Sequence, residues 1–165
     1  MMSSDSPIGP PVLQMRVVVE AEDYEEAVHF YRDILGLTEQ AAFEGEDDAR
    51  VAILEAGRAT LEIANPAQKR MIDEVEVGRA VAPKIRIAFE VVDSTATTDR
   101  LVAGGATLIA PPVETPWRSL NSRLAAPAGL QITLFQELES FEERTAREGF
   151  GTDAARGSDP SPAGG

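Results

Sequence analysis

The feature that most constrains the fold is a pair of similar segments in the two halves of the chain. Residues 16–23 read Arg-Val-Val-Val-Glu-Ala-Glu-Asp, and residues 86–93 read Arg-Ile-Ala-Phe-Glu-Val-Val-Asp. In both, an arginine, three apolar residues and a glutamate lead to an aspartate that precedes a helical pattern. Because two copies are too few for a solenoid, the repeat predicts a duplicated module whose halves face each other. Equivalent residues such as Arg16 and Arg86 would then line one shared cavity.

The composition argues against several kinds of site and partner. The 165 residues include no cysteine, which removes disulfides, thiolate metal sites and cysteine nucleophiles. A net charge of -13 argues against nucleic acid, because phosphate binding requires lysine and arginine. No apolar stretch approaches the roughly 18 residues of a membrane span, and residues 1–11 lack the pattern of a signal peptide. We therefore expect a cytoplasmic protein that does not enter a membrane.

The first module is predicted to cover residues 12–64, after a flexible N-terminus of residues 1–11, and to have the order βαβββ. Asp23 is a suitable helix N-cap, and Glu26 follows at the capping-box spacing. Apolar residues then recur at helical spacing until Gly36, which ends the helix. The predicted strands around this helix cover residues 12–20, 37–44, 50–56 and 59–64.

The second module repeats this order over residues 84–137. Residues 65–83 form a linker with proline near both ends and a predicted helical turn at residues 68–73. A tail over residues 138–165 is predicted to be acidic at first, with a short helix, and then disordered, because glycine, serine, proline and alanine dominate it. The elements predicted for the module are a helix over 94–103 and strands over 84–92, 107–112, 117–125 and 130–136.

Strand parity separates the side chains of each module into two sets. Alternate residues of a strand face opposite sides, so Ile87 and Phe89 share one face while Arg86 and Glu90 share the other. The apolar set is expected to pack under a helix. The polar set must face water or a wet cavity, because an unpaired buried charge is costly. Each module is therefore predicted to be a sheet with one apolar face and one polar-lined face.

The helix of the first module carries a family motif. Residues 27–36 read Ala-Val-His-Phe-Tyr-Arg-Asp-Ile-Leu-Gly, which fits the pattern A-x-x-F-Y-x-x-x-L-G. With residues 60–63, 87–91 and 127–129, this run resembles the vicinal oxygen chelate superfamily, which includes glyoxalase I, extradiol dioxygenases and bleomycin-resistance proteins. The resemblance covers about residues 13–137. It implies an α+β fold of two paired βαβββ modules that form a curved mixed sheet around a cavity, and it implies a homodimer.

The resemblance also assigns the positions that hold a metal in metal-using members of the superfamily. The opening-strand positions are occupied by Arg16 and Arg86, and the closing-strand positions by Glu62 and Thr133. A guanidinium has no free lone pair and repels a cation, and threonine alone is a poor ligand. The single histidine, His29, lies in the middle of a helix, away from the inferred pocket. We therefore expect neither a metal nor another cofactor, and no triad that depends on histidine.

The remaining polar residues allow two interpretations. Arg16 and Arg86 could converge as a clamp on an anionic ligand, or they could form ion pairs with nearby glutamates. Glu62 and Glu90 are the candidate general bases if either carboxylate is desolvated. Trp117 could stack on a ligand or pack in the core. The other candidate ligand contacts are Phe43, Arg118, Thr133 and Phe135.

Two functions fit these residues. The first is binding of a small organic molecule in the cavity, for example to sequester an antibiotic or a metabolite, and the acidic charge suits a cationic drug of the bleomycin type. The second is a metal-independent lyase, isomerase or epimerase acting next to a carbonyl, with arginines stabilising an enolate-like oxygen and a glutamate moving the proton. A surface-acting scaffold or regulatory protein is a third possibility, which a cavity filled by large side chains would favour.

Overall fold

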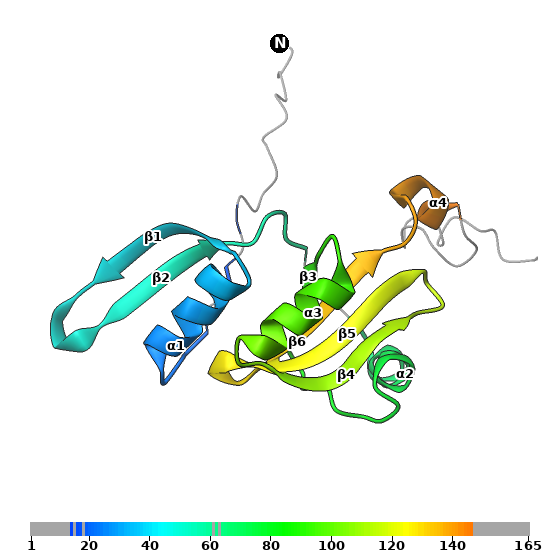
Figure 1. Ribbon diagram of the computed structural model, residues 1–165, viewed down its shortest axis with the longest axis horizontal. Helices are drawn as coiled ribbons and strands as arrows, with labels where there is room; N and C mark the ends of the chain where they lie inside the picture. The colour runs from blue at the N-terminus through cyan, green and yellow to red at the C-terminus, as the bar shows by residue number, and fades with distance from the viewer. Residues whose placement is uncertain (1–13, 15, 18, 61, 63, 147–165) are drawn as a thin grey trace, which may run out of the picture. The chain divides into compact units, whose positions relative to one another are not determined.

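The computed structural model describes residues 14, 16–17, 19–60, 62 and 64–146 and divides into two compact units. Unit 1 comprises the described residues up to Ala64 together with Pro127–Gly129. Unit 2 comprises Asn65–Ala126 and the described chain from Leu130 onward. Each unit combines helix with a sheet of its own, of two and four strands, as the predicted α+β class requires (Figure 1).

The helix of unit 1 begins where the sequence predicts. The carboxylate of Asp23 accepts a hydrogen bond of 3.0 Å from the backbone N–H of Glu26, which caps α1 (Tyr24–Val28). The helix continues as the π-helical segment η1 (His29–Ile34), whose last turn closes with a bond of 2.8 Å from the N–H of Leu35 to the carbonyl of Phe30. The buried residues of this helix are Ala27, Phe30 and Tyr31.

The sheet of unit 1 is an antiparallel pair of β1 (Thr38–Glu44) and β2 (Arg50–Glu55), with the 3-10 turn η2 (Glu46–Asp48) between them. Two further strands were predicted at residues 12–20 and 59–64. Residues 12, 13, 15, 18, 61 and 63 of these segments lie outside the described residues, and the described residues of both segments are not in strands. The two outer strands of the first module therefore stay predictions.

Unit 2 contains the predicted βαβββ order. Its helix is α3 (Ser94–Ala103), and its sheet has the order β3-β6-β5-β4, with β3 parallel to β6 and the other neighbours antiparallel. β3 is shorter than the strand predicted over residues 84–92, because Ile85 precedes it and is 72% exposed. The strands are β3 (Ile87–Glu90), β4 (Thr107–Glu114), β5 (Ser119–Ala126) and β6 (Leu130–Glu137).

The apolar core of unit 2 lies between this sheet and α3, which runs alongside the strands in Figure 1. Asp93 caps α3 by accepting a 2.9 Å bond from the N–H of Ala96, so the repeat places the same cap before both helices. The hydroxyls of Thr98 and Ser122 join helix to strand at 2.7 Å. Four core side chains of this layer have no exposed surface, namely Leu101, Leu124, Ile132 and Leu134.

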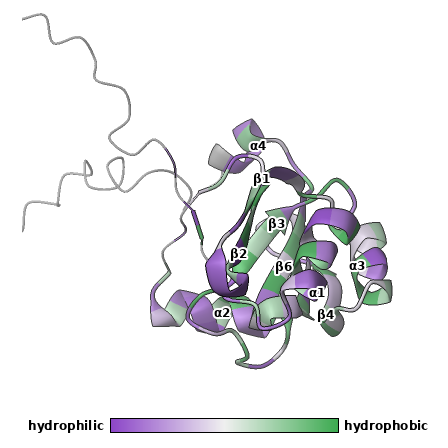
Figure 2. Ribbon diagram, turned by 90° about the vertical axis from the view of Figure 1, so that its left-hand side faces the viewer, coloured by the Kyte–Doolittle hydropathy of each residue, from purple (hydrophilic) through white to green (hydrophobic). Residues whose placement is uncertain are grey.

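The linker contains a full helix, α2 (Pro66–Glu76), where the sequence predicted only a turn. The side chain of Asn65 accepts a 2.9 Å bond from the N–H of Gln68, and the proline follows at the first helical position. Gly78, at a φ of 82°, lets the chain leave the helix. Figure 2 shows hydrophilic stretches along α2. The prediction was too short because it weighed the apolar pattern and overlooked this start signal.

A short helix, α4 (Phe141–Thr145), follows the last strand and agrees with the predicted helical start of the acidic tail. Ser140 and Glu143 form a reciprocal capping box, with bonds of 3.1 Å and 2.8 Å. The predicted disorder further along the tail concerns residues 149–165, which lie outside the described residues.

Candidate ligand-binding site

The candidate site is the face of the unit 2 sheet that points away from α3. In the ladder between β5 and β6, Arg123 pairs with Thr133 and Asn121 pairs with Phe135, so these four side chains share one face. Their neighbours on β5 and β6, including Ser122, lie on the α3 side. We call the first set the polar face. Its guanidinium, hydroxyl and amide groups can all hydrogen-bond a ligand.

Two of the residues predicted from the sequence meet on the polar face. Arg86 lies just before β3 and is half-buried, and its Nη1 donates a hydrogen bond to the Oγ1 of Thr133. Thr133 is 1% exposed. Arg86, the arginine of the second repeat, is therefore bound to β6, the closing strand of its own module.

A second arginine, Arg123, is buried at the centre of the polar face and is 0% exposed. Its Nη1 donates to the Oδ1 of Asp73 at 2.9 Å and to the Oε1 of Gln131 at 2.8 Å. Its Nη2 donates to the Oε2 of Glu76 at 2.5 Å. The Oε1 of Glu76 also accepts a 2.6 Å bond from the Nδ2 of Asn121. We call these five residues the Arg123 network. It joins α2 to the polar face by charge-assisted hydrogen bonds.

Asp73 is the most constrained carboxylate of the network and is 2% exposed. Its Oδ2 accepts two further bonds of 2.9 Å from the N–H groups of Val81 and Ala82. Burial by itself raises the pKa of this carboxyl. The two backbone donors and the Arg123 guanidinium outweigh that effect and hold the pKa of Asp73 below its ordinary value. Asp73 is therefore a fixed anion at neutral pH.

Sequence reasoning missed Asp73 and Glu76 as site residues, and it considered Asn121 and Arg123 only as polar side chains on the same segment as Arg118. Two spacings carried the signal. Asp73 and Glu76 are three apart, which places both on one face of a helix. Asn121 and Arg123 are two apart, which places both on one face of a strand. The signal was overlooked because the linker was expected to contain no more than one helical turn.

The other predicted residues of unit 2 lie around the polar face. Phe135 is half-buried on it, and Glu90 ends β3 and is exposed. Trp117 is half-buried in the turn before β5. Arg118 follows it at a φ of 62° and forms an exposed ion pair, with 3.4 Å between its Nη1 and the Oε1 of Glu114. Arg118 therefore binds a surface carboxylate of its own hairpin.

The predicted residues of unit 1 are more exposed. The Nε of Arg16 donates to the Oε1 of Gln14 at 3.2 Å, and both residues are exposed. Phe43 pairs with Val51 between β1 and β2 and is 61% exposed. Glu62 is also exposed. Whether Arg16 takes part in a clamp with Arg86 stays a prediction.

Two concavities among the described residues bear on the candidate site. In unit 2, a cavity of about 320 Å³ opens between the first half of α2 and residues 80–82, and Lys69, Arg70 and Asp73 line it. In unit 1, a cavity of about 480 Å³ is lined by Ala128, Gly129 and the acidic side chains of Glu20, Glu22, Asp23 and Glu26. Both volumes are within the range of small-ligand pockets, about 300–1,000 Å³.

Two structural findings concern metals and membranes. Over the described part of the chain, no group of three or more histidine, cysteine or acidic residues could hold a metal ion. The helices of that part are all too short or too polar to span a bilayer.

Comparison with known families assigns the fold. The profile described as Glyoxalase/Bleomycin resistance protein/Dioxygenase superfamily matches residues 15–134. The chain belongs to this superfamily. This match confirms the predicted resemblance and the predicted fold class. Comparison with curated proteins found no match.

Solved structures of the glyoxalase superfamily and other proteins are similar to the chain. A glyoxalase-related enzyme from Fulvimarina pelagi is 20% identical, with 76% of this chain and 89% of that chain covered and a TM-score of 0.47. TnmS3, an antibiotic binding protein from Streptomyces sp. CB03234, is 21% identical, with 75% and 99% covered and a TM-score of 0.48. The hypothetical protein SA1046 from S. aureus is 11% identical, with 76% and 94% covered and a TM-score of 0.51, a likeness of fold.

Proposed function

We propose that this protein binds a small organic molecule, such as an antibiotic or a metabolite, and that the polar face of unit 2 contributes to the ligand site. The observation that carries the proposal is the pair of arginines on this face. Arg86 bonds to Thr133, and Arg123 is buried among polar partners. These guanidinium groups are fixed on the side of the sheet that points away from the apolar core. Fixed cationic groups of this kind can bind a polar ligand.

We further propose that binding does not use the metal of the superfamily. Three of the four positions that the resemblance assigns to ligands carry Arg16, Arg86 and Thr133. A guanidinium offers no lone pair, and Arg86 already donates to Thr133. Glu62, at the fourth position, is exposed. These residues do not fit a divalent metal, so no chemical step is assigned to one.

The alternative is a metal-independent lyase, isomerase or epimerase. It requires a general base within reach of the substrate, and Glu62 and Glu90 were the candidates. Both are exposed, so neither lies in a water-excluded pocket where a base could meet a bound substrate. Binding without turnover is therefore the preferred proposal. We also propose that the protein is a homodimer and is located in the cytoplasm. Light scattering of the purified chain would test whether it is a dimer.

A thermal-shift screen against antibiotics and carboxylated metabolites, followed by calorimetric titration, tests the proposal. A bound ligand should raise the melting temperature by mass action. If the ligand is anionic, Arg86→Ala should weaken its binding by about 1–3 kcal/mol, because a charged hydrogen bond is lost. Arg79→Ala is the matched control, because Arg79 is exposed in the loop before β3.

Three results would contradict the proposal. If no compound of the screen raises the melting temperature, small-molecule binding is wrong. If a compound binds and chromatography shows that it is converted, the enzyme alternative is correct. If Arg86→Ala lowers the stability but leaves the affinity for an anionic ligand unchanged, Arg86 is only a structural partner of Thr133.

A further inference from the structure

The α2 helix presents two carboxylates to the polar face in the way an anionic ligand would. Asp73 contacts one terminal nitrogen of the Arg123 guanidinium and Glu76 contacts the other, at 2.9 Å and 2.5 Å. Both carboxylates come from one helix face, three residues apart. Planar recognition of this kind is what makes arginine suitable for binding carboxylates. Arg123 therefore has the geometry of an anion site whose anions are supplied by the chain itself.

The attachment of α2 to the sheet depends on charge more than on apolar burial. The buried residues of the helix are Ile72, Asp73 and Glu76, so a single apolar side chain is buried beside two carboxylates. Met71, the largest apolar neighbour, is 41% exposed. An interface that buries little apolar surface opens at a lower free energy than a core. An anion that satisfies Arg123 equally well could therefore replace the helix.

The Arg123 network leaves two buried polar atoms without partners among the described residues. These are the Nε of Arg123 and the Oδ1 of Asn121. Buried donors and acceptors are nearly always paired, and each one left unpaired is destabilising. The two atoms are a donor and an acceptor, so a ligand with both an anionic oxygen and a hydroxyl or N–H group would satisfy them together. The α2 carboxylates, which are acceptors only, cannot satisfy the Oδ1 of Asn121.

A concavity beside the helix adjoins the Asp73 end of the Arg123 network. The cavity of about 320 Å³ that opens next to α2 has Asp73 in its lining, together with the cationic side chains of Lys69 and Arg70. Two cations at the wall of a cavity attract an anion despite the net charge of -13 of the whole chain. An anion entering here would meet the Asp73 end of the Arg123 network.

We propose that Arg123 and Asn121 form a binding site for a small organic anion that also carries a hydroxyl or N–H donor, and that α2 covers this site with Asp73 and Glu76 until the ligand displaces it. This inference rests on the proposed function, because it names the ligand class for the same polar face. A site that is open only part of the time shows an affinity reduced by its open fraction. Removing the carboxylates of Asp73 and Glu76 should therefore strengthen ligand binding, whereas removing carboxylates that do not contact Arg123 should not.

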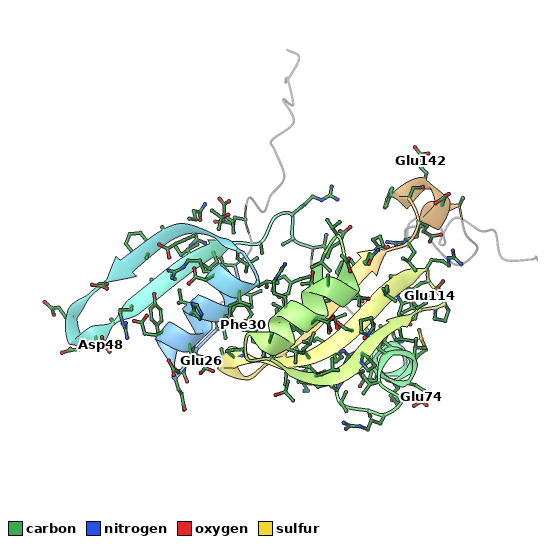
Figure 3. The ribbon with its side chains drawn as sticks, viewed as in Figure 1. Glu26, Phe30, Asp48, Glu74, Glu114 and Glu142 are labelled. Atoms are coloured by element: carbon green, nitrogen blue, oxygen red, sulfur yellow. The ribbon has the colours of Figure 1, made fainter. Side chains whose placement is uncertain are left out.

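The test is calorimetric titration of L-malate, a dicarboxylate with a hydroxyl, into Asp73→Asn/Glu76→Gln and into the wild-type chain. Malate should bind the double variant at least about tenfold more tightly. The control Glu74→Gln/Glu114→Gln changes the net charge equally, and Figure 3 shows both of its glutamates, with Glu74 pointing away from the sheet. It should bind malate like the wild type.

Two further measurements keep the test decisive. Should the double variant not fold, Glu76→Gln alone, which keeps the Asp73 bonds, should still strengthen malate binding about threefold. Succinate, which lacks the hydroxyl, should bind the double variant more weakly than malate, because it cannot donate to the Oδ1 of Asn121.

The outcomes separate this inference from the proposed function. Equal malate affinity in the wild type, the variant and the control, or no malate binding by any of them, would overturn the role of α2. Equal binding of malate and succinate would overturn the hydroxyl assignment. A screened compound that binds the wild type while malate fails on the α2 variant would leave the proposed function standing. If the α2 variant binds malate but no screened compound binds the wild type, the inference about Arg123 and α2 stands and the proposed function fails.

Discussion

The two units start from the same repeated segment but are stabilised in different ways. In unit 1, the sheet has two strands, and six of the seven residues of β1 are exposed. In unit 2, α3 covers one face of a four-stranded sheet with apolar contacts, and α2 covers the other with the Arg123 network. Isolated two-stranded sheets are marginal, whereas a sheet covered on both sides is not.

In both modules an aspartate N-cap fixes where the helix begins. The extent of burial in each module depends instead on the residues that follow the helix. Asp23 and Asp93 cap their helices in the same way. Among the described residues, a fully buried arginine, Arg123, lies on the sheet of the second module, and the preceding helix α2 supplies the carboxylates that neutralise it. The following predictions test that difference, beginning with the largest expected effect.

Arg123→Ala should lower the free energy of unfolding by about 3–5 kcal/mol, because it leaves the buried carboxylates of Asp73 and Glu76 unpaired. Urea unfolding measures this change. Arg118→Gln is the control, because the ion pair of Arg118 with Glu114 is exposed and should contribute no more than about 1 kcal/mol. Similar losses in both variants would mean that the Arg123 network does not stabilise unit 2.

Leu124→Ala should destabilise the chain by about 2–5 kcal/mol, because Leu124 is 0% exposed under α3 and its removal leaves a cavity. Phe43→Ala, on β1, should change the stability by no more than about 0.5 kcal/mol, because Phe43 is 61% exposed. Thermal unfolding of both variants gives the contrast between the units. A large loss for Phe43→Ala would mean that the face of β1 is buried in solution.

The contribution of Asp73 to stability should depend on pH. Its pKa in the folded protein is lower than the ordinary 3.8, so its carboxylate stabilises unit 2 above that pH. This contribution is lost as the pH falls below 3.8 and through the lowered pKa. Urea midpoints between about pH 5 and pH 1 should fall more steeply for the wild type than for Asp73→Asn. Parallel slopes would contradict the assignment.

Tyr31→Phe should lower the free energy of unfolding by about 0.5–1.5 kcal/mol. The hydroxyl of Tyr31 donates a 2.9 Å bond to the carbonyl of Pro127 within unit 1, and burial raises the pKa of this phenol. Urea unfolding of the variant measures the loss of that bond. An unchanged midpoint would show that this contact between distant parts of the chain adds no stability to unit 1.

Much of the fold could be predicted because its signals are local. The N-caps at Asp23 and Asp93, the helix motif of residues 27–36 and the alternation of β3, β5 and β6 all act over a few residues. The domain boundaries, including those of the linker over residues 65–83, stay predictions, although α2 belongs to unit 2 in the structure.

The candidate site was predicted only in part. The contact of Arg86 with Thr133 joins two positions that the repeat and the resemblance had singled out. The Arg123 network joins residues about fifty positions apart, and a single sequence does not reveal which distant acidic pair meets a given arginine. The polarity of the helix and strand faces was visible in the sequence, but their docking was not.

Hydrogen exchange of the wild-type chain, with and without a saturating organic anion such as L-malate, tests the central claim most directly. We predict that the anion speeds exchange of the α2 amides over residues 69–77 while the α3 amides over residues 97–103 keep their protection, because the ligand takes the place of Asp73 and Glu76 on Arg123. Unchanged or slower exchange of α2 at saturation would contradict it.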